Sequence, residues 1–231
     1  MKSDIDRQCF GRSGTCSREL AKGQKGKMVT TSEIEIEIWT AAAAVMETIR
    51  SRRSIGRVAP ERPDRALIET LLEAATWAPN HHLTEPWRFV VLAGDARAAF
   101  GRAMAEALIG DPENEEKREA FDRAAAKALR APVIIAVAID PESGPKSVEI
   151  EEIAAGAAAV QNILLAAHAH GLAAIWRTGA AALHSHVKAF FDLPPSAHLL
   201  GFVYLGYPSG PNPLRERTPH SAVTRWQGWD E

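Results

Sequence analysis

The sequence predicts an α+β fold, because its helical and strand-like segments interleave without the regular βαβ spacing of a doubly wound sheet. Residues 132–139 form an uninterrupted apolar run of strand length, whereas residues 149–170 repeat apolar side chains at helical spacing. Gly94 ends an earlier apolar run but does not begin the glycine fingerprint of a dinucleotide-binding fold, and the sequence contains no P-loop. These features favour a mixed domain built around one buried strand and one long apolar helix.

Length and composition are those of an ordinary globular protein. The 231 residues are enough for a core that needs no disulfides, and 46% of them are hydrophobic and 24% charged. A net charge of −2 argues against a general nucleic-acid binder, since phosphate backbones require a basic surface. The apolar runs fall short of the roughly 20 residues of a membrane-spanning helix, and no secretory leader is recognisable. We therefore expect a cytoplasmic protein.

The first 45 residues differ in composition from the rest. The chain is polar and rich in Gly, Ser and Lys up to Lys27, and Ile and Glu then alternate from Glu33 to Ile38. This alternation is compatible with a short strand, but nothing nearby supplies a strand partner. We expect residues 1–45 to be a mobile, disordered extension and residues 46–231 to form a single domain.

The first helix of the domain is expected to begin after Asp64, an N-cap, and to end near Trp77, because Pro79 disfavours helical geometry in the residue before it. Apolar residues share one face of this helix: Leu67, Ile68, Leu71, Leu72 and Ala75. A buried strand is expected to follow at residues 89–93 and to end at Gly94.

Two helices are expected between this strand and the apolar run at 132–139. The first covers residues 95–109, and the second, which is more charged, covers residues 113–130 after an Asp111-Pro112 start. Small residues lie nearly all around the 149–170 helix. We expect that helix to be buried on more than one side, at a domain centre or in a subunit interface.

Short elements complete the domain after Gly171, which is expected to end the long helix. They are a strand over residues 173–176, a turn, a helix over 184–191 and a final strand over 199–205. The tail beyond them carries several prolines and two tryptophans. It is too irregular for a core and too aromatic to be free in water, so we expect it to dock on another surface.

Several cations precede the first predicted helix. Arg50, Arg52, Arg53 and Arg57 lie in one short stretch, with Ser54 among them. Arginine is always charged and binds phosphate through two nitrogens, and a serine hydroxyl adds a neutral donor, so the set suits a phosphomonoester. The alternative, given equal weight, is the C-terminal end of a short helix whose basic residues face solvent.

Pro79 and Pro86 bracket a loop that contains His81 and His82 and opens onto Trp87. Imidazole donates a hydrogen bond to a ring carbonyl or heteroatom, and flanking prolines hold such a donor still. The alternative is that both histidines bond to nearby backbone. Adjacent histidines lack the usual spacing of metal ligands, and the two cysteines lie in a polar stretch without further ligands, so no metal site is predicted.

A third polar cluster follows the strand at 173–176, where Trp176 leads into Arg177 and Thr178. The alternative is that Trp176 fills the core and that Arg177 pairs with a carboxylate. Because three separate segments each pass from apolar structure into a polar or aromatic cluster, together they favour a cofactor pocket. No nucleophile elbow and no paired carboxylates are recognisable, so we assign no catalytic residue and expect a cofactor to carry the chemistry.

In this order, the segments resemble the nitroreductase family of flavin mononucleotide (FMN) enzymes, especially its smallest NAD(P)H nitroreductases. The resemblance runs from about Met46 to Leu214. Its marks are Arg52-Arg-Ser54, Ala78-Pro-Asn-His81, Pro86-Trp87, Arg130-Ala-Pro-Val133, Ile175-Trp-Arg-Thr-Gly179 and Gly201-Phe-Val-Tyr-Leu-Gly206. None of these motifs is specific alone, but the ordered set is.

The resemblance implies an α+β fold with a central, mostly antiparallel sheet flanked by helices. It also implies an interlocked homodimer with two flavin sites at the interface, each lined by both subunits. The implied FMN-binding residues are Arg52, Arg53 and Ser54 at the phosphate and ribityl chain, Trp77 and His81 from the partner subunit, and Trp176, Arg177 and Thr178 against the isoalloxazine ring.

The implied reaction is hydride transfer from NAD(P)H to the flavin, followed by transfer of two electrons to an electron-poor acceptor such as a nitroaromatic or a quinone. Arg177 near the pyrimidine edge would stabilise the reduced ring. Two alternatives remain open: a different flavin chemistry on the same scaffold, such as dehalogenation or flavin fragmentation, and a non-catalytic flavin-binding protein. A basic interaction module at residues 50–57 is the weakest reading, given the acidic overall charge.

Two residues depart from the family's pattern. Trp77 stands where a polar or basic side chain is expected, which suggests that it stacks on the ring. Glu85 stands where similar chains have glutamine. A carboxylate beside a flavin that becomes anionic on reduction is unfavourable unless it points away or pairs, and Arg88 is one candidate partner, so the orientation of Glu85 stays open.

Overall fold

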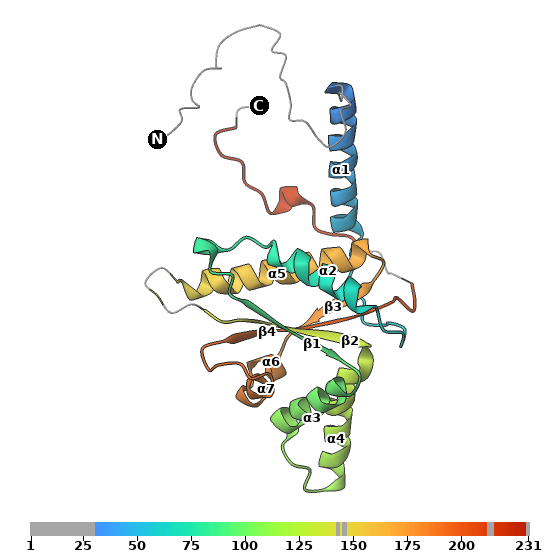
Figure 1. Cartoon of the computed structure of the whole chain (residues 1–231), viewed down its shortest axis with the longest axis vertical. Helices are drawn as coiled ribbons and strands as arrows, with labels where there is room; N and C mark the ends of the chain where they lie inside the picture. The colour runs from blue at the N-terminus through green and yellow to red at the C-terminus, as the bar shows by residue number, and fades with distance from the viewer. Residues whose placement is uncertain (1–30, 142–143, 145–146, 212–214, 230–231) are drawn as a thin grey trace. The chain divides into compact units, whose positions relative to one another are not determined.

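The structure is a computed structural model that describes residues 31–141, 144, 147–211 and 215–229 (Figure 1). The chain divides into two compact units, residues 1–43 and 44–231. Helix α1 (Thr31–Ser51) includes the Ile/Glu alternation that the sequence suggested as a short strand, so that suggestion is wrong. Residues 1–30 of the expected mobile extension lie outside the described residues, and mobility of the remainder stays a prediction.

The larger unit contains one four-stranded sheet. Its strands are β1 (Trp87–Ala93), β2 (Val133–Ile139), β3 (Ala173–Arg177) and β4 (His198–Gly206), in the order β1-β2-β4-β3. Every neighbouring pair is antiparallel. The predicted α+β fold with an antiparallel sheet is therefore confirmed.

Helices cover both faces of the sheet (Figure 1). One face carries α2 (Arg65–Thr76) and α5 (Glu149–Ala169). The other carries α3 (Asp95–Ile109), α4 (Glu115–Ala125), α6 (Ala180–Leu183) and α7 (Ser185–Phe190). Three short 3-10 turns complete the described elements: η1 (His81–Leu83), η2 (Ala126–Arg130) and η3 (His220–Ala222).

The core consists of two apolar layers, one on each side of the sheet. The α2 and α5 layer includes Leu71 and Ile163, both fully buried. The opposite layer is centred on Phe100, which contacts the rings of Phe191 and Phe202. By length and composition α5 is the one described helix that could cross a membrane, but it packs against α2 and the sheet, as a core helix does.

Most predicted boundaries agree with the structure, and the differences concern β1, the charged helix and the last predicted helix. β1 begins earlier than expected, at Trp87, and is an edge strand rather than a buried one, since only β2 pairs with it. The charged helix begins after Asn114, whose Oδ1 accepts a hydrogen bond from the Lys117 N–H at 2.9 Å, so Asp111-Pro112 is not its cap. That helix gives way to η2 after Ala125. The last predicted helix begins one residue later than expected, and α6 precedes it.

Candidate functional site

Residues 50–57, called here the arginine segment, begin in the last turn of α1 and continue beside β3. Ser54 forms a parallel bridge with Ala174, and the Ile55 N–H donates to the Ala174 carbonyl at 3.0 Å. At the start of the segment, the Ser51 hydroxyl lies 2.7 Å from Nε2 of His168, in the last turn of α5. These contacts fix the backbone between the end of α1 and β3, and with it the positions of Arg52 and Arg53.

Arg52 and Arg53 lie at this segment, and Arg217 is near enough to act on Arg52 electrostatically. Burial lowers the pKa of Arg52 from its ordinary value, and the nearby Arg217 and Arg53 lower it further. The guanidinium nevertheless stays charged at neutral pH. Nη1 of Arg52 and Nε of Arg53 are buried and have no hydrogen-bond partner. Within the described residues, no carboxylate pairs with any of the three, so the cluster suits an external anion.

Arg217 was not predicted as a site residue. It lies in the C-terminal tail, far in sequence from Arg52, and we interpreted that tail only through its tryptophans. The signal that could have indicated it is the Arg215-Glu-Arg217 triplet in an otherwise proline-rich stretch. Only the fold shows that this tail returns to the arginine segment.

The end of β3 lies next to the arginine segment. A Cβ built on Gly56 would lie 3.0 Å from Nη2 of Arg177, so Arg177 and this segment are close neighbours. The Arg177 guanidinium carbon lies 5.6 Å from the centroid of the Tyr204 ring, a cation–π contact. Nε of Arg177 is buried without a hydrogen-bond partner, and no described carboxylate pairs with the group, unlike the ion-paired alternative considered from sequence.

Trp176 and Thr178 are the neighbours of Arg177 in the chain, and the Trp176 side chain points to the other face of the sheet. Trp176 is half-buried against the α2 and α5 layer, and Thr178 is exposed just after the strand. The structure thus brings the segments of the first and third predicted clusters together, with Ser54 bridged to Ala174 and Arg177 beside Gly56. The Trp176 side chain, in contrast, lies on the opposite face of the sheet from Arg177, which contacts Tyr204.

The loop of residues 80–86, called here the 80–86 loop, has a strained backbone. His82, Leu83 and Glu85 adopt positive φ angles of 53°, 57° and 45°. The left-handed region costs a non-glycine residue about 1–2 kcal/mol, and such strain gathers at functional sites. The Asn80 side-chain oxygen accepts from the Glu85 N–H at 3.1 Å, and Nδ1 of His81 lies 3.2 Å from a carboxylate oxygen of Glu151.

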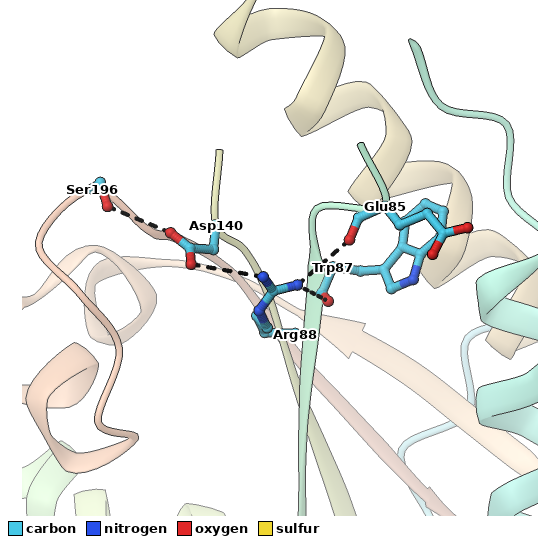
Figure 2. A network of polar contacts seen from close by, with 5 residues as sticks. All are labelled: Glu85, Trp87, Arg88, Asp140 and Ser196. Atoms are coloured by element: carbon cyan, nitrogen blue, oxygen red, sulfur yellow. Dashed lines mark hydrogen bonds and ion pairs between the residues drawn. The ribbon is translucent and has the colours of Figure 1, made fainter. Parts of the chain in front are cut away.

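Glu85 does not pair with Arg88, which corrects the sequence-based expectation. Figure 2 shows that Arg88 instead donates to the backbone carbonyls of Trp87, at 3.0 Å, and Glu85, at 3.4 Å. Its other terminal nitrogen lies 3.8 Å from Asp140. The Glu85 carboxylate points away from Arg88 (Figure 2) and has no ion-pair partner in the part of the chain that the structure describes.

Within one chain, His81 and the arginine segment lie at opposite ends of α5. His81 contacts Glu151 in its first turn, whereas Ser51 contacts His168 in its last turn. The helix between Glu151 and His168 spans about 26 Å at its standard rise. His81 and Ser51 are therefore separated by roughly the length of this helix within one chain.

The cavities within the single chain do not coincide with the predicted site. One of about 480 Å³ lies between α2 and β1, and one of about 350 Å³ lies beside Pro132. Neither is lined by a predicted site residue. These two cavities are therefore separate from the candidate site.

A family comparison agrees with this geometry. Residues 49–207, which include the arginine segment, the 80–86 loop and the end of β3, match the model of the nitroreductase family. The chain belongs to the nitroreductase family. It is 31% identical over 163 residues to the Escherichia coli K12 protein named "Putative NAD(P)H nitroreductase YdjA", an alignment that covers 71% of this chain and 87% of that protein.

Solved nitroreductase structures share the fold. A nitroreductase-like protein from Bacillus cereus superposes with a TM-score of 0.71 at 24% identity, covering 80% of this chain and 96% of that one. A nitroreductase from Desulfovibrio desulfuricans, solved in complex with FMN, superposes with a TM-score of 0.64 at 28% identity, covering 80% and 98%.

Proposed function

We propose that this nitroreductase-family protein is an FMN-dependent oxidoreductase that takes hydride from NAD(P)H and passes two electrons to an electron-poor acceptor such as a nitroaromatic or a quinone. The observation that carries the proposal is the cluster of Arg52, Arg53 and Arg217, which has buried, unpartnered nitrogens and no carboxylate among the described residues. The FMN bound by the Desulfovibrio relative supports the same assignment.

The residues present fit an FMN phosphate. A phosphomonoester carries up to two negative charges, and several guanidinium groups around one anion match that charge and its acceptor oxygens. Arg52 and Arg53 would bind the phosphate, the exposed hydroxyl of Ser54 would donate to it or to the ribityl chain, and Arg217 would add a third cation. Bound FMN would supply two-electron transfer between nicotinamide and acceptor.

Arg177 is the residue best placed to act on the flavin ring. It lies beside the arginine segment and stacks on Tyr204, which limits the directions its guanidinium can take. A fixed cation near the pyrimidine edge favours the ring when it carries negative charge, since a preorganised charge needs no rearrangement during the reaction. Thr178, which is exposed just after β3, would line the same site, whereas the Trp176 ring lies on the opposite face of the sheet from Arg177.

A homodimer is part of this proposal. Trp77 is 80% exposed at the end of α2, and His81 is exposed about one α5 length from the arginine segment. Their exposure leaves both side chains accessible to a second copy of the chain. A second copy would bring its Trp77 and His81 to the flavin held by the first chain, so that each site is lined by both subunits.

The test is anaerobic reduction of the purified protein. Oxidised flavin gives the protein a yellow colour, which NADH or NADPH is expected to bleach and a nitroaromatic or quinone to restore. A protein that stays colourless when supplied with FMN overturns the proposal. A yellow protein that neither nicotinamide bleaches is a flavin-binding protein, and one that is bleached but not reoxidised by either acceptor points to a different flavin chemistry.

A further inference from the structure

Glu152 is the one buried charged side chain in the described part of the chain, with 2% of its surface exposed. It lies in the first turn of α5, where the helix dipole favours a negative charge. No described cation pairs with it. A buried carboxylate is retained only where hydrogen bonds replace its lost water, so its partners indicate what it does.

The partners of Glu152 connect α5 to the 80–86 loop. Its Oε2 accepts a hydrogen bond from the Thr84 hydroxyl at 2.8 Å. Its Oε1 receives a longer bond, of 3.4 Å, from the Ser147 hydroxyl. The short bond to Thr84 therefore provides the main compensation for burying the charge.

Thr84 connects Glu152 to His81 through its backbone. The Thr84 N–H donates to the His81 carbonyl at 3.2 Å and closes the η1 turn. The backbone of one residue is thus bonded to His81 while its side chain is bonded to a buried group in the core. The residue before Glu152 also contacts His81: a carboxylate oxygen of Glu151 lies 3.2 Å from Nδ1 of the His81 ring.

The loop has other bonds at its ends and at His81, but within the described residues the Thr84 hydroxyl is the loop group that bonds to a buried side chain. Three of its residues have positive φ angles, and Leu83 is 82% exposed. A strained conformation persists only where its surroundings fix it. Loss of the Thr84 bond would let the η1 turn relax and the His81 ring leave its position.

We propose that Glu152 is a positioning residue: through Thr84 it holds the 80–86 loop in the conformation that presents His81 to the flavin of the neighbouring subunit. This inference depends on the proposed FMN function. Glu152 touches neither flavin nor substrate, and it acts by fixing the loop before the cofactor binds.

The decisive variant is Thr84→Val, which removes the hydroxyl but keeps the shape of the side chain. Thr84→Ser restores the hydroxyl and serves as the rescue. Glu149→Gln is the control for a change in the same turn of α5 that leaves the Thr84–Glu152 bond in place, because the partner of Glu149 is His198, at 3.1 Å. Amide hydrogen exchange of residues 81–85 in FMN-free protein, FMN affinity and urea unfolding are measured for all four proteins.

In Thr84→Val we expect faster exchange of the loop amides and FMN binding weaker by about tenfold, since one bond to a charged group is lost. Thr84→Ser and Glu149→Gln should bind FMN as the wild type does. A lower urea midpoint with unchanged loop exchange and FMN affinity would show a purely structural role and overturn the inference. If the wild type itself fails to bind FMN, the proposed function falls, and the role of Glu152 toward the flavin falls with it.

Discussion

The indole Nε1 of Trp176 donates a hydrogen bond to the carbonyl oxygen of Leu200 at 3.1 Å. This bond joins the end of β3 to β4 immediately before Gly201, which has a φ of +132°. A Cβ on Gly201 would lie 2.8 Å from that nitrogen and 2.4 Å from the carbonyl oxygen of Arg177. A glycine at 201 thus lets β4 approach closely enough to fix both site residues.

Replacing Gly201 by alanine is therefore expected to disturb the site as well as the fold. Gly201→Ala should lower the free energy of unfolding by about 3 kcal/mol or more, from backbone strain and overpacking together, and should weaken FMN binding. Gly171→Ala is the control, because Gly171 has a φ of +74° with no atom within 4 Å of the added Cβ. It should lose only about 1–2 kcal/mol. If urea unfolding shows the same loss of unfolding free energy for Gly201→Ala and Gly171→Ala, the steric explanation is contradicted.

The tail residue Arg217 is predicted to contribute to anion binding. Arg217→Ala should weaken FMN binding by about 10- to 100-fold, because a charge-assisted hydrogen bond contributes about 1.5–3 kcal/mol. The comparison is Arg65→Ala, which removes a cation whose side chain is 90% exposed and paired with Glu69. Fluorescence titration should show an effect for Arg217 only, and a similar affinity for both variants would remove Arg217 from the site.

Tyr204 is predicted to make stability fall at high pH. Burial raises the pKa of Tyr204 from its ordinary value of 10.0, although Arg177 and Arg130 act in the opposite direction. The folded state therefore keeps the phenol proton at a pH where the unfolded state loses it, so the stabilisation is complete below about pH 10 and is lost above it. Tyr204→Phe should show a shallower loss of stability between pH 9 and 11 in urea unfolding. If the unfolding free energies of wild type and Tyr204→Phe fall equally with pH, Tyr204 is not the cause of the loss of stability.

Local sequence patterns predicted most of the fold. The apolar run at residues 132–139 is the buried strand β2, and helix α3 has the predicted bounds of residues 95–109. These elements follow from periodicity, which acts within a single segment. The edge position of β1 was not predictable in this way, because the burial of a strand depends on which other strands pair with it.

The candidate site was predictable in its parts but not in its assembly. Arg52 and Arg177 were recognised from sequence, and the fold brings their segments together. Arg217 and Glu152 were not singled out, because each acts on a residue distant in sequence: Arg217 on Arg52 through its charge, and Glu152 on Thr84 through a hydrogen bond. The distance between His81 and the arginine segment also emerges only from the fold, where each contacts a different end of α5.

The most direct test compares the binding of FMN and riboflavin, which differ only by the phosphate, in wild type and Arg52→Ala. If Arg52, Arg53 and Arg217 bind that phosphate, the wild type should bind FMN at least about 100-fold more tightly than riboflavin. In Arg52→Ala the ratio of the two affinities should be smaller by about tenfold or more. Equal affinity of the wild type for both flavins would contradict the account.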